Sequence, residues 1–192
     1  MDNNQLFTVT VFTENQAGLL NQISIVFYRR GLNIESLSVS PSSIKDVHKF
    51  TITCWSNRPM MERVVKQIEK RVDVLRSFLY TDDEIIYQEV ALYKVPVAPM
   101  LDGGAVERII RRHNARILDF TRQYVIVEKT GHPDETESLF EELKAYGILQ
   151  FVRSGRVAVT KSNEELLTRY LDEQERRRVF EQGKSLCLHQ IS

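Results

Sequence analysis

The residues of this chain that could do chemistry are few, and their spacing matches no common catalytic or metal-binding pattern. The four histidines lie far apart, and no His-x-x-x-His or Cys-x-x-Cys spacing occurs that would bind a metal ion. No serine lies in a nucleophile-elbow pattern, and the glycine signatures of dinucleotide and P-loop sites are absent. Glu14 and Glu35 could meet in the folded chain, but we expect both on exposed surfaces. The sequence therefore predicts no catalytic residue and no metal site.

The bulk composition is typical of a globular protein. Of 192 residues, 42% are hydrophobic and 27% are charged, and the formal net charge of +0 gives no attraction to nucleic acid or an anionic membrane. The two cysteines, Cys54 and Cys187, do not make a disulfide framework. No apolar run reaches the roughly 18 residues of a membrane helix, and the first residues lack signal-peptide features. We expect a cytoplasmic protein with neither nucleic acid nor membrane as a partner.

One loop has the residue types of an anion-binding site. The segment TENQAGLL (residues 13–20) joins a β-like run at 6–12 to a helical pattern. Asn15, Ala17 and Gly18 would then lie at a helix N-terminus, where unpaired backbone N–H groups and the helix dipole favour an anion. A small ligand with a carboxylate would suit this loop. The alternative is an ordinary β-to-α turn, in which Asn and Gly are merely turn formers.

The elements that must position this loop follow a βαββαβ order. Period-two patterns and turn residues predict strands at 6–12, 34–40, 47–55 and 72–80. Helices are predicted to begin near Gly18 and Pro59. Helical spacing predicts the buried faces of the two helices as Leu19, Leu20, Ile23, Val26 and Phe27 in the first, and Met60, Met61, Val64, Val65, Ile68 and Val72 in the second.

The second half of the chain repeats this order after a charged break at 82–84. Strands are predicted at 85–97, 115–121, 124–130, 148–152 and 156–160, with helices beginning near Gly104 and Pro133. In the first of these strands, Val90, Leu92 and Tyr93 are expected to face a core. The repeat of roughly 80 residues predicts an α+β fold of two tandem ferredoxin-like βαββαβ domains with a C-terminal helical tail. The predicted divisions are residues 1–81, 82–161 and 162–192.

Two further features bear on the roles of the parts. Asp102 lies near the position in the second repeat that Asn15 has in the first, and its carboxylate would repel an anion. We therefore expect the first domain to hold the ligand and the second to serve contacts. The tail begins with Ser162-Asn163-Glu164-Glu165, which is typical of a capping box. It is expected to be a surface helix that docks onto a partner, or else a solvated extension of low order.

Three motifs together carry a resemblance to a known family. They are Glu14-Asn15-x-Ala17-Gly18-Leu19-Leu20, Arg30-Gly31-x-Asn33-Ile34-Glu35-Ser36-Leu37 and Val72-Asp73-Val74-Leu75-Arg76. With them, residues 5–160 resemble the regulatory (small) subunit of acetohydroxyacid synthase, also called acetolactate synthase. Arg153-Ser154-Gly155 is similar to the segment that closes that family's second domain. Asn-x-x-Gly alone would indicate only an ACT domain, a βαββαβ amino-acid sensor that dimerises.

The resemblance implies a non-catalytic homodimer that binds and activates the large, catalytic subunit of acetolactate synthase in branched-chain amino-acid biosynthesis. It also implies feedback inhibition by valine or another branched-chain amino acid. No cofactor is expected in this chain, since thiamine diphosphate and magnesium would belong to the catalytic partner, with FAD left open. Carried over by motif, the effector site at the dimer interface would be lined by Asn15, Ala17, Gly18, Leu19, Leu20, Asn33 and Ile34.

Some points stay open at this stage. Leu20 and Asn21 stand where members of the family commonly carry Ser or Ala, which leaves the effector's identity open. The tail beyond about Lys161 is longer than in many relatives. A stand-alone tandem-ACT regulator of another protein is one alternative function, and a small enzyme on a ferredoxin-like scaffold is another, because that fold hosts many functions.

Overall fold

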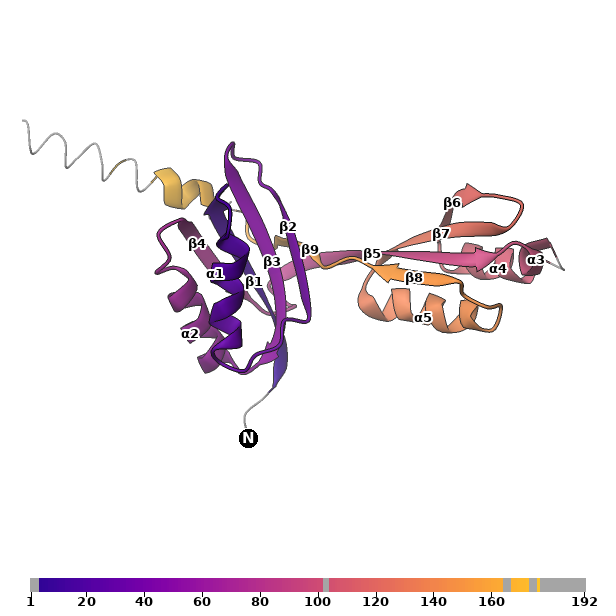
Figure 1. Ribbon diagram of the computed structural model, residues 1–192, viewed down its shortest axis with the longest axis horizontal. Helices are drawn as coiled ribbons and strands as arrows, with labels where there is room; N and C mark the ends of the chain where they lie inside the picture. Colours follow the sequence, from indigo (N-terminus) through magenta and orange to yellow (C-terminus); the bar gives the residue numbers. More distant parts are fainter. Residues whose placement is uncertain (1–3, 102–103, 164–166, 173–175, 177–192) are drawn as a thin grey trace, which may run out of the picture. The chain divides into compact units, whose positions relative to one another are not determined.

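The computed structural model describes residues 4–101, 104–163, 167–172 and 176. By compactness the chain divides into Met1–Val159 and Thr160–Ser192. The first unit contains two β-sheets, each with a hydrophobic core of its own (Figure 1). The α+β class and the two βαββαβ repeats expected from the sequence are confirmed. The domain limits at residues 81 and 161 stay a prediction.

The first sheet is antiparallel and has its two helices on one face (Figure 1). Its spatial order is β2-β3-β1-β4, so β2 and β4 are the edge strands. The strands are β1 Gln5–Glu14, β2 Ser36–Pro41, β3 Val47–Ser56 and β4 Val74–Tyr80. The helices are α1 Leu19–Tyr28 and α2 Arg58–Ile68.

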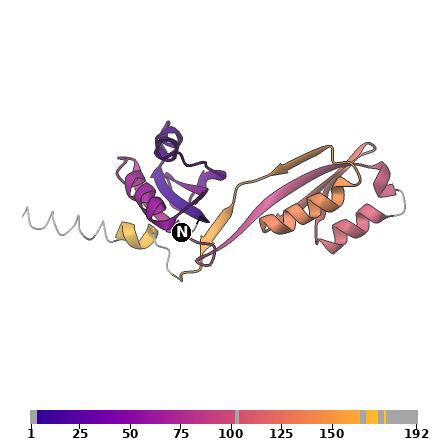
Figure 2. The same ribbon diagram turned by 90° about the horizontal axis from the view of Figure 1, so that it is seen from below.

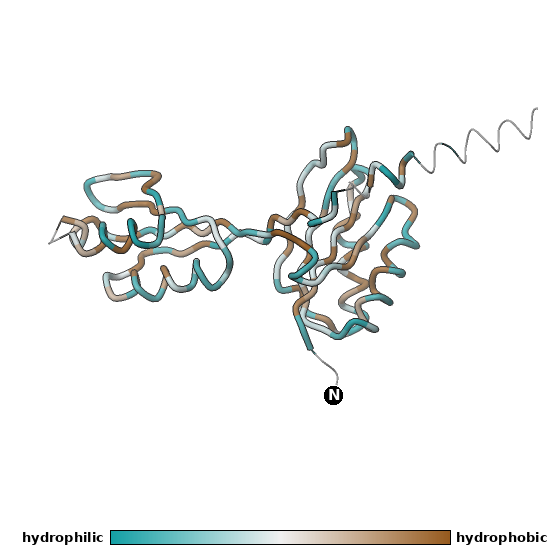
Figure 3. Tube along the Cα trace, turned by 180° about the vertical axis from the view of Figure 1, so that it is seen from behind, coloured by the Kyte–Doolittle hydropathy of each residue, from teal (hydrophilic) through white to brown (hydrophobic). Residues whose placement is uncertain are grey.

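Alternation along the central strands explains why the helices pack on one face only. Phe7, Val9 and Val11 of β1 are fully buried, and each is paired with an apolar residue of β3. The intervening positions are polar, with Thr8 and Thr10 as examples, so the two faces of the sheet differ in chemistry. Along the helices, hydrophobic and hydrophilic segments alternate with the turns (Figure 3), as expected for helices with one apolar face. The apolar face of the sheet and the apolar stripes of the helices therefore form one core.

Two positions predicted for the buried helix faces are exposed. Leu20 is 47% exposed, because the buried stripe of α1 consists of Leu19, Ile23, Val26 and Phe27 and Leu20 lies at its margin. Val72 is 95% exposed, because α2 ends at Ile68 and helical spacing no longer applies in the turn that follows. These two assignments were wrong.

The second sheet repeats the arrangement with one short helix added. Its order is β6-β7-β5-β8, and β9 also pairs with β5. Helices α4 and α5 cover one face of the sheet (Figure 2). The elements are β5 Ile85–Pro96, α3 Ala98–Leu101, α4 Ala105–Arg112, β6 Arg116–Phe120, β7 Tyr124–Gly131, α5 Pro133–Lys144, β8 Gln150–Arg153 and β9 Val157–Thr160.

The core of this second sheet corrects the prediction for its first strand. Ala91, Tyr93 and Val95 are buried, whereas Val90 and Leu92 are 38% and 36% exposed on the other face. Neighbouring residues of a strand point to opposite faces, so Leu92 and Tyr93 cannot share one. The Tyr93 hydroxyl donates a hydrogen bond to the Thr136 carbonyl at 2.6 Å, which satisfies the one polar group of this buried side chain. Burial also raises the pKa of the Tyr93 phenol.

Part of the tail falls outside the described residues. Residues 167–172 are helical. The predicted capping box extends into residues 164–166, and Asp102 and Cys187 also lie outside the described ranges. Over the portion that is described, no helix is both long enough and apolar enough to cross a membrane.

The start of α2 gives a test of local stability. The Asn57 side-chain oxygen accepts a hydrogen bond from the Met60 backbone N–H at 2.9 Å. Asn57→Ala removes this cap and should lower the free energy of unfolding by about 1 kcal/mol. Asn57→Asp keeps an acceptor and should lose less than half as much. Urea denaturation measures both variants, and equal stability of Asn57→Ala and the wild-type chain would contradict the role of the cap.

Candidate functional site

The loop between β1 and α1 ends in a backbone conformation that favours glycine. Gly18 precedes α1 with φ at 87°, in the left-handed region that side chains with a Cβ rarely adopt. Apart from Gly18 and its two chain neighbours, no atom of the described residues lies within 4 Å of the position that a Cβ would occupy there. The preference for glycine therefore comes from the backbone angle, and the space in front of Gly18 is open.

Backbone hydrogen bonds hold this loop against two neighbouring turns. The Asn15 N–H donates to the Asp46 carbonyl at 3.1 Å, and the Glu14 N–H donates to the Asp73 carbonyl at 3.0 Å. Asp46 itself has a positive φ of 63°. Sequence reasoning missed these two anchors, because only strand pairing brings the 46 and 73 turns beside residue 15. The loop is thus fixed by the sheet that carries it.

The start of α1 presents unpaired backbone donors. The first helical hydrogen bond runs from the Gln22 N–H to the Gly18 carbonyl at 3.1 Å, so the N–H groups of residues 19–21 have no acceptor within the helix. No side chain caps this end, and its first turn carries no acidic residue. Asn15, Ala17 and Gly18 are exposed around it. This arrangement favours an anion with several acceptor oxygens, such as a carboxylate.

The equivalent helix of the second repeat differs in charge. Gly104 precedes α4 with φ at 64°, so the backbone begins this helix in the same way. Its first turn, however, carries Glu107, whose carboxylate pairs with Arg111 at 2.6 Å. A carboxylate in that turn already interacts with the positive end of the helix dipole and repels another anion. The start of α1 is therefore the better anion site of the two.

The two leucines that follow Gly18 have different environments. Leu19 is 2% exposed and packs in the core, so only its backbone N–H is available to a ligand. Leu20 is 47% exposed beside the helix start and can contact an apolar group. Its exposure, which the helical pattern did not indicate, gives the site one apolar wall.

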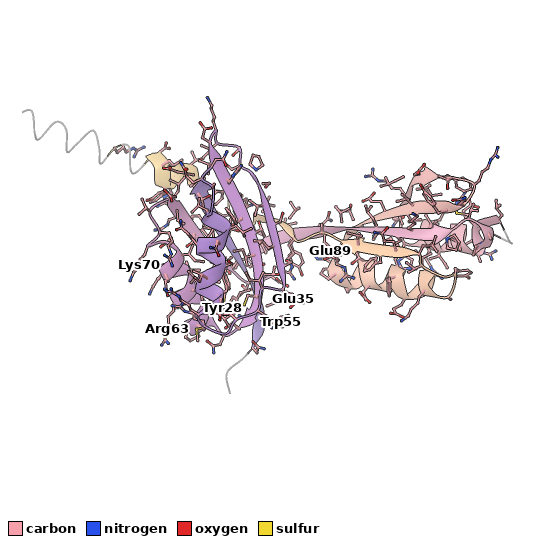
Figure 4. The ribbon with its side chains drawn as sticks, in the orientation of Figure 1. Tyr28, Glu35, Trp55, Arg63, Lys70 and Glu89 are labelled. Atoms are coloured by element: carbon pink, nitrogen blue, oxygen red, sulfur yellow. The ribbon has the colours of Figure 1, made fainter. Side chains whose placement is uncertain are left out.

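Asn33 and Ile34 lie at the other end of the sheet. They precede β2, in which Ser36 is paired with Thr53 of β3, whereas Glu14 is paired with Val47. Thr53 and Val47 are six residues apart along β3, which corresponds to about 20 Å. Within one copy of the chain, the structure does not bring Asn33 and Ile34 to the loop at 15–18. For the same reason it does not bring Glu14 to Glu35; of these two residues, Glu35 is labelled in Figure 4.

Strand β2 connects these two ends along an edge of the sheet, where no other strand of the described residues pairs with its outer side. Asn33 and Ile34 precede its first residue, and after its last residue the Ser42 N–H donates to the Val47 carbonyl at 2.8 Å. Val39 in the middle of β2 is 45% exposed. An edge strand offers unpaired backbone donors and acceptors to a further strand.

The described ranges contain no group of three or more His, Cys, Asp or Glu side chains placed to hold a metal ion.

Two of the histidines have structural contacts. His113 Nε2 lies 3.0 Å from Glu142 Oε1, and this hydrogen bond lowers the pKa of Glu142. The His132 backbone N–H donates to Glu135 at 2.8 Å at the start of α5 and lowers the pKa of that carboxyl.

The sequence matches known protein families and their members over most of its length. Residues 9–76 match the family model described as an AHAS small subunit-like ACT domain, and residues 88–162 match the model for the small subunit of acetolactate synthase. The chain is 32% identical over 156 residues to a probable acetolactate synthase small subunit of Archaeoglobus fulgidus, covering 81% of this chain and 97% of that one. It is 32% identical over 158 residues to the acetolactate synthase small subunit of Bacillus subtilis, covering 82% and 91%.

A solved structure has the same fold. The crystal structure of an acetolactate synthase small subunit from Thermotoga maritima superposes with a TM-score of 0.75 at 24% identity. The match covers 83% of this chain and 99% of that chain. Both βαββαβ repeats are therefore shared with a protein of known structure.

Proposed function

Because the chain belongs to the family of acetolactate synthase small subunits, we propose that it regulates an acetolactate synthase in branched-chain amino-acid biosynthesis. In this role it binds a catalytic large subunit, raises its activity and transmits feedback inhibition. The chain itself does not catalyse. Thiamine diphosphate and magnesium belong to the catalytic partner.

The observation that carries the proposed sensing role is the uncapped start of α1. A branched-chain amino acid such as valine places its carboxylate against the free N–H groups of residues 19–21. Leu20 and Ile34 contact the branched side chain, and the Asn15 and Asn33 amides bind the ammonium and carboxylate groups. Asn15, Leu20 and Asn33 are all exposed, which this arrangement requires.

Residues at both ends of the first sheet can contact one ligand only if two copies pair. Antiparallel pairing of β2 with β2 of a second copy, related by a twofold axis, continues the sheet across the interface. In that pairing the start of one β2 lies beside the end of the other. Asn33 and Ile34 of one copy then lie at the level of the 15–18 loop of its partner, where Ser42 and Val47 mark the end of β2.

This arrangement couples effector binding to assembly. A ligand held between two copies stabilises the pair, and pairing in turn raises the affinity for the ligand. Reconstitution tests the function as a whole: adding the chain to the catalytic subunit should raise its turnover, and valine should reverse the gain. Turnover by the chain alone, or no effect on the catalytic subunit, would contradict the proposed function.

A charge substitution at Gly18 tests the carboxylate contact. Gly18→Asp places a negative charge at the helix start and should lower valine affinity at least tenfold, through repulsion of the ligand carboxylate. Gly18→Asn is the matched control, because Asn is similar in size and also tolerates a positive φ but carries no charge. Calorimetric titration of the full chain measures both. Equal valine affinity in the two variants would show that the valine carboxylate does not bind at this helix start.

A substitution on the free edge of β2 tests the pairing. Val39→Lys puts like charges close together across a twofold contact and should shift the chain to monomers, with loss of valine binding. Val39→Thr keeps a β-branched neutral side chain and should remain paired. Sedimentation velocity and valine titration measure the two effects. A monomeric Val39→Lys chain that still binds valine normally would show that one copy holds the complete site.

A further inference from the structure

A solvent-open cavity of about 440 Å³ lies on the helix layer of the first domain, outside the proposed effector site. It is lined by Arg30, Arg63, Lys66, Gln67 and Lys70. Arg63 and Lys66 belong to α2, and Lys70 lies two residues beyond its end. In Figure 4, the labelled Arg63 and Lys70 lie along the outer side of α2. The chain has a formal net charge of +0, so four cationic side chains around one cavity are a local concentration of charge.

Three of these cations are available to a ligand. Arg63 and Lys66 lie on one face of α2, and Lys70, in the turn that follows, lines the same cavity. All three are exposed, and across the described part of the chain none has an ion-pair or hydrogen-bond partner.

Two carboxylates on or next to α2, those of Glu62 and Glu69, are engaged elsewhere. Glu62 lies 3.9 Å from Arg58, and neither residue lines the cavity. Glu69 accepts the Ser77 backbone N–H at 3.0 Å and pairs with Arg76 at 3.3 Å. The positive charge of the cavity is thus not neutralised by these side chains.

The fourth cation, Arg30, is held in place by two hydrogen bonds. The Arg30 guanidinium donates to the Val26 carbonyl at 3.1 Å and to the Gln67 side-chain oxygen. The Gln67 oxygen thus already accepts from Arg30, and its amide NH₂ remains as a donor. Every side chain around the cavity then offers N–H groups to a ligand.

This chemistry excludes some ligands and favours one class. An amino acid needs an acceptor for its ammonium group, and a divalent cation needs carboxylate or carbonyl oxygens, so neither suits a lining of donors. Arg and Lys side chains bind phosphate oxygens strongly, and several cations together suit an anion with several charges. We propose that this cavity binds an anion with two or more linked phosphate groups. Its volume lies within the range of small-molecule sites.

Calorimetric titration of the full chain with pyrophosphate and tripolyphosphate, without divalent metal, tests this inference. Both anions should bind, and inorganic phosphate should bind at least tenfold more weakly because it engages fewer cations. Arg63→Gln combined with Lys70→Gln should weaken pyrophosphate binding at least tenfold. Lys45→Gln is the matched control, since Lys45 is an exposed lysine of the same domain outside the cavity, and it should change the affinity less than twofold.

Three results would overturn the inference. One is the absence of pyrophosphate binding, which would leave these cations to a partner protein or to the negative C-terminal end of α2. Another is binding that the double variant does not weaken. The third is an equal loss in Lys45→Gln, which would indicate unspecific attraction. Valine binding uses other residues, so a failure here leaves the proposed regulatory function unaffected.

Discussion

The proposed effector site depends on three backbone N–H groups at the start of α1 that have no acceptor within the helix. Gly18 opens the helix with φ at 87°, and no side chain caps it. Such an end is stable only if water or a ligand accepts these hydrogen bonds. The sheet fixes the loop through the Asp46 and Asp73 carbonyls, so the donors are held in position before a ligand arrives. Preorganisation of this kind lowers the cost of ordering on binding.

The register of the first sheet imposes a second constraint. Along β3, Thr53 lies beside the start of β2, which Asn33 precedes, and Val47 lies beside the end of β1, which the Asn15 loop follows. These two ends of the sheet are roughly 20 Å apart, which is farther than one amino-acid ligand can reach. A site that uses both asparagines must therefore combine two copies of the chain. The proposed antiparallel pairing of β2 with a second copy would meet this requirement along the edge of the sheet, and it would couple effector binding to assembly. A regulatory subunit can use this coupling to report the amino-acid level to its catalytic partner.

Much of the fold could be predicted from the sequence because periodicity is a local property. The alternation of Phe7, Val9 and Val11 gave the first strand, and Gly18 marked the start of the helix after it. Burial at the margins of elements was less predictable: Val72 lies beyond the end of α2, and Leu20 lies beside the apolar stripe of α1. The separation of Asn15 from Asn33 depends on strand register, which no short motif specifies. The basic cavity between Arg30 and α2 likewise forms only when two helices pack together.

Complementation between two defective chains tests the central claim most directly. Gly18→Asp damages the loop of one copy and Asn33→Ala damages the start of β2 in the other, and each homodimer should bind valine at least tenfold more weakly. If the site combines two copies, a mixed dimer contains one intact site and one site with both defects. Calorimetric titration of the mixed dimer should then recover wild-type affinity with about half the wild-type stoichiometry. No recovery in a dimer shown to be mixed would mean that both residues act within one copy, and it would contradict the shared site.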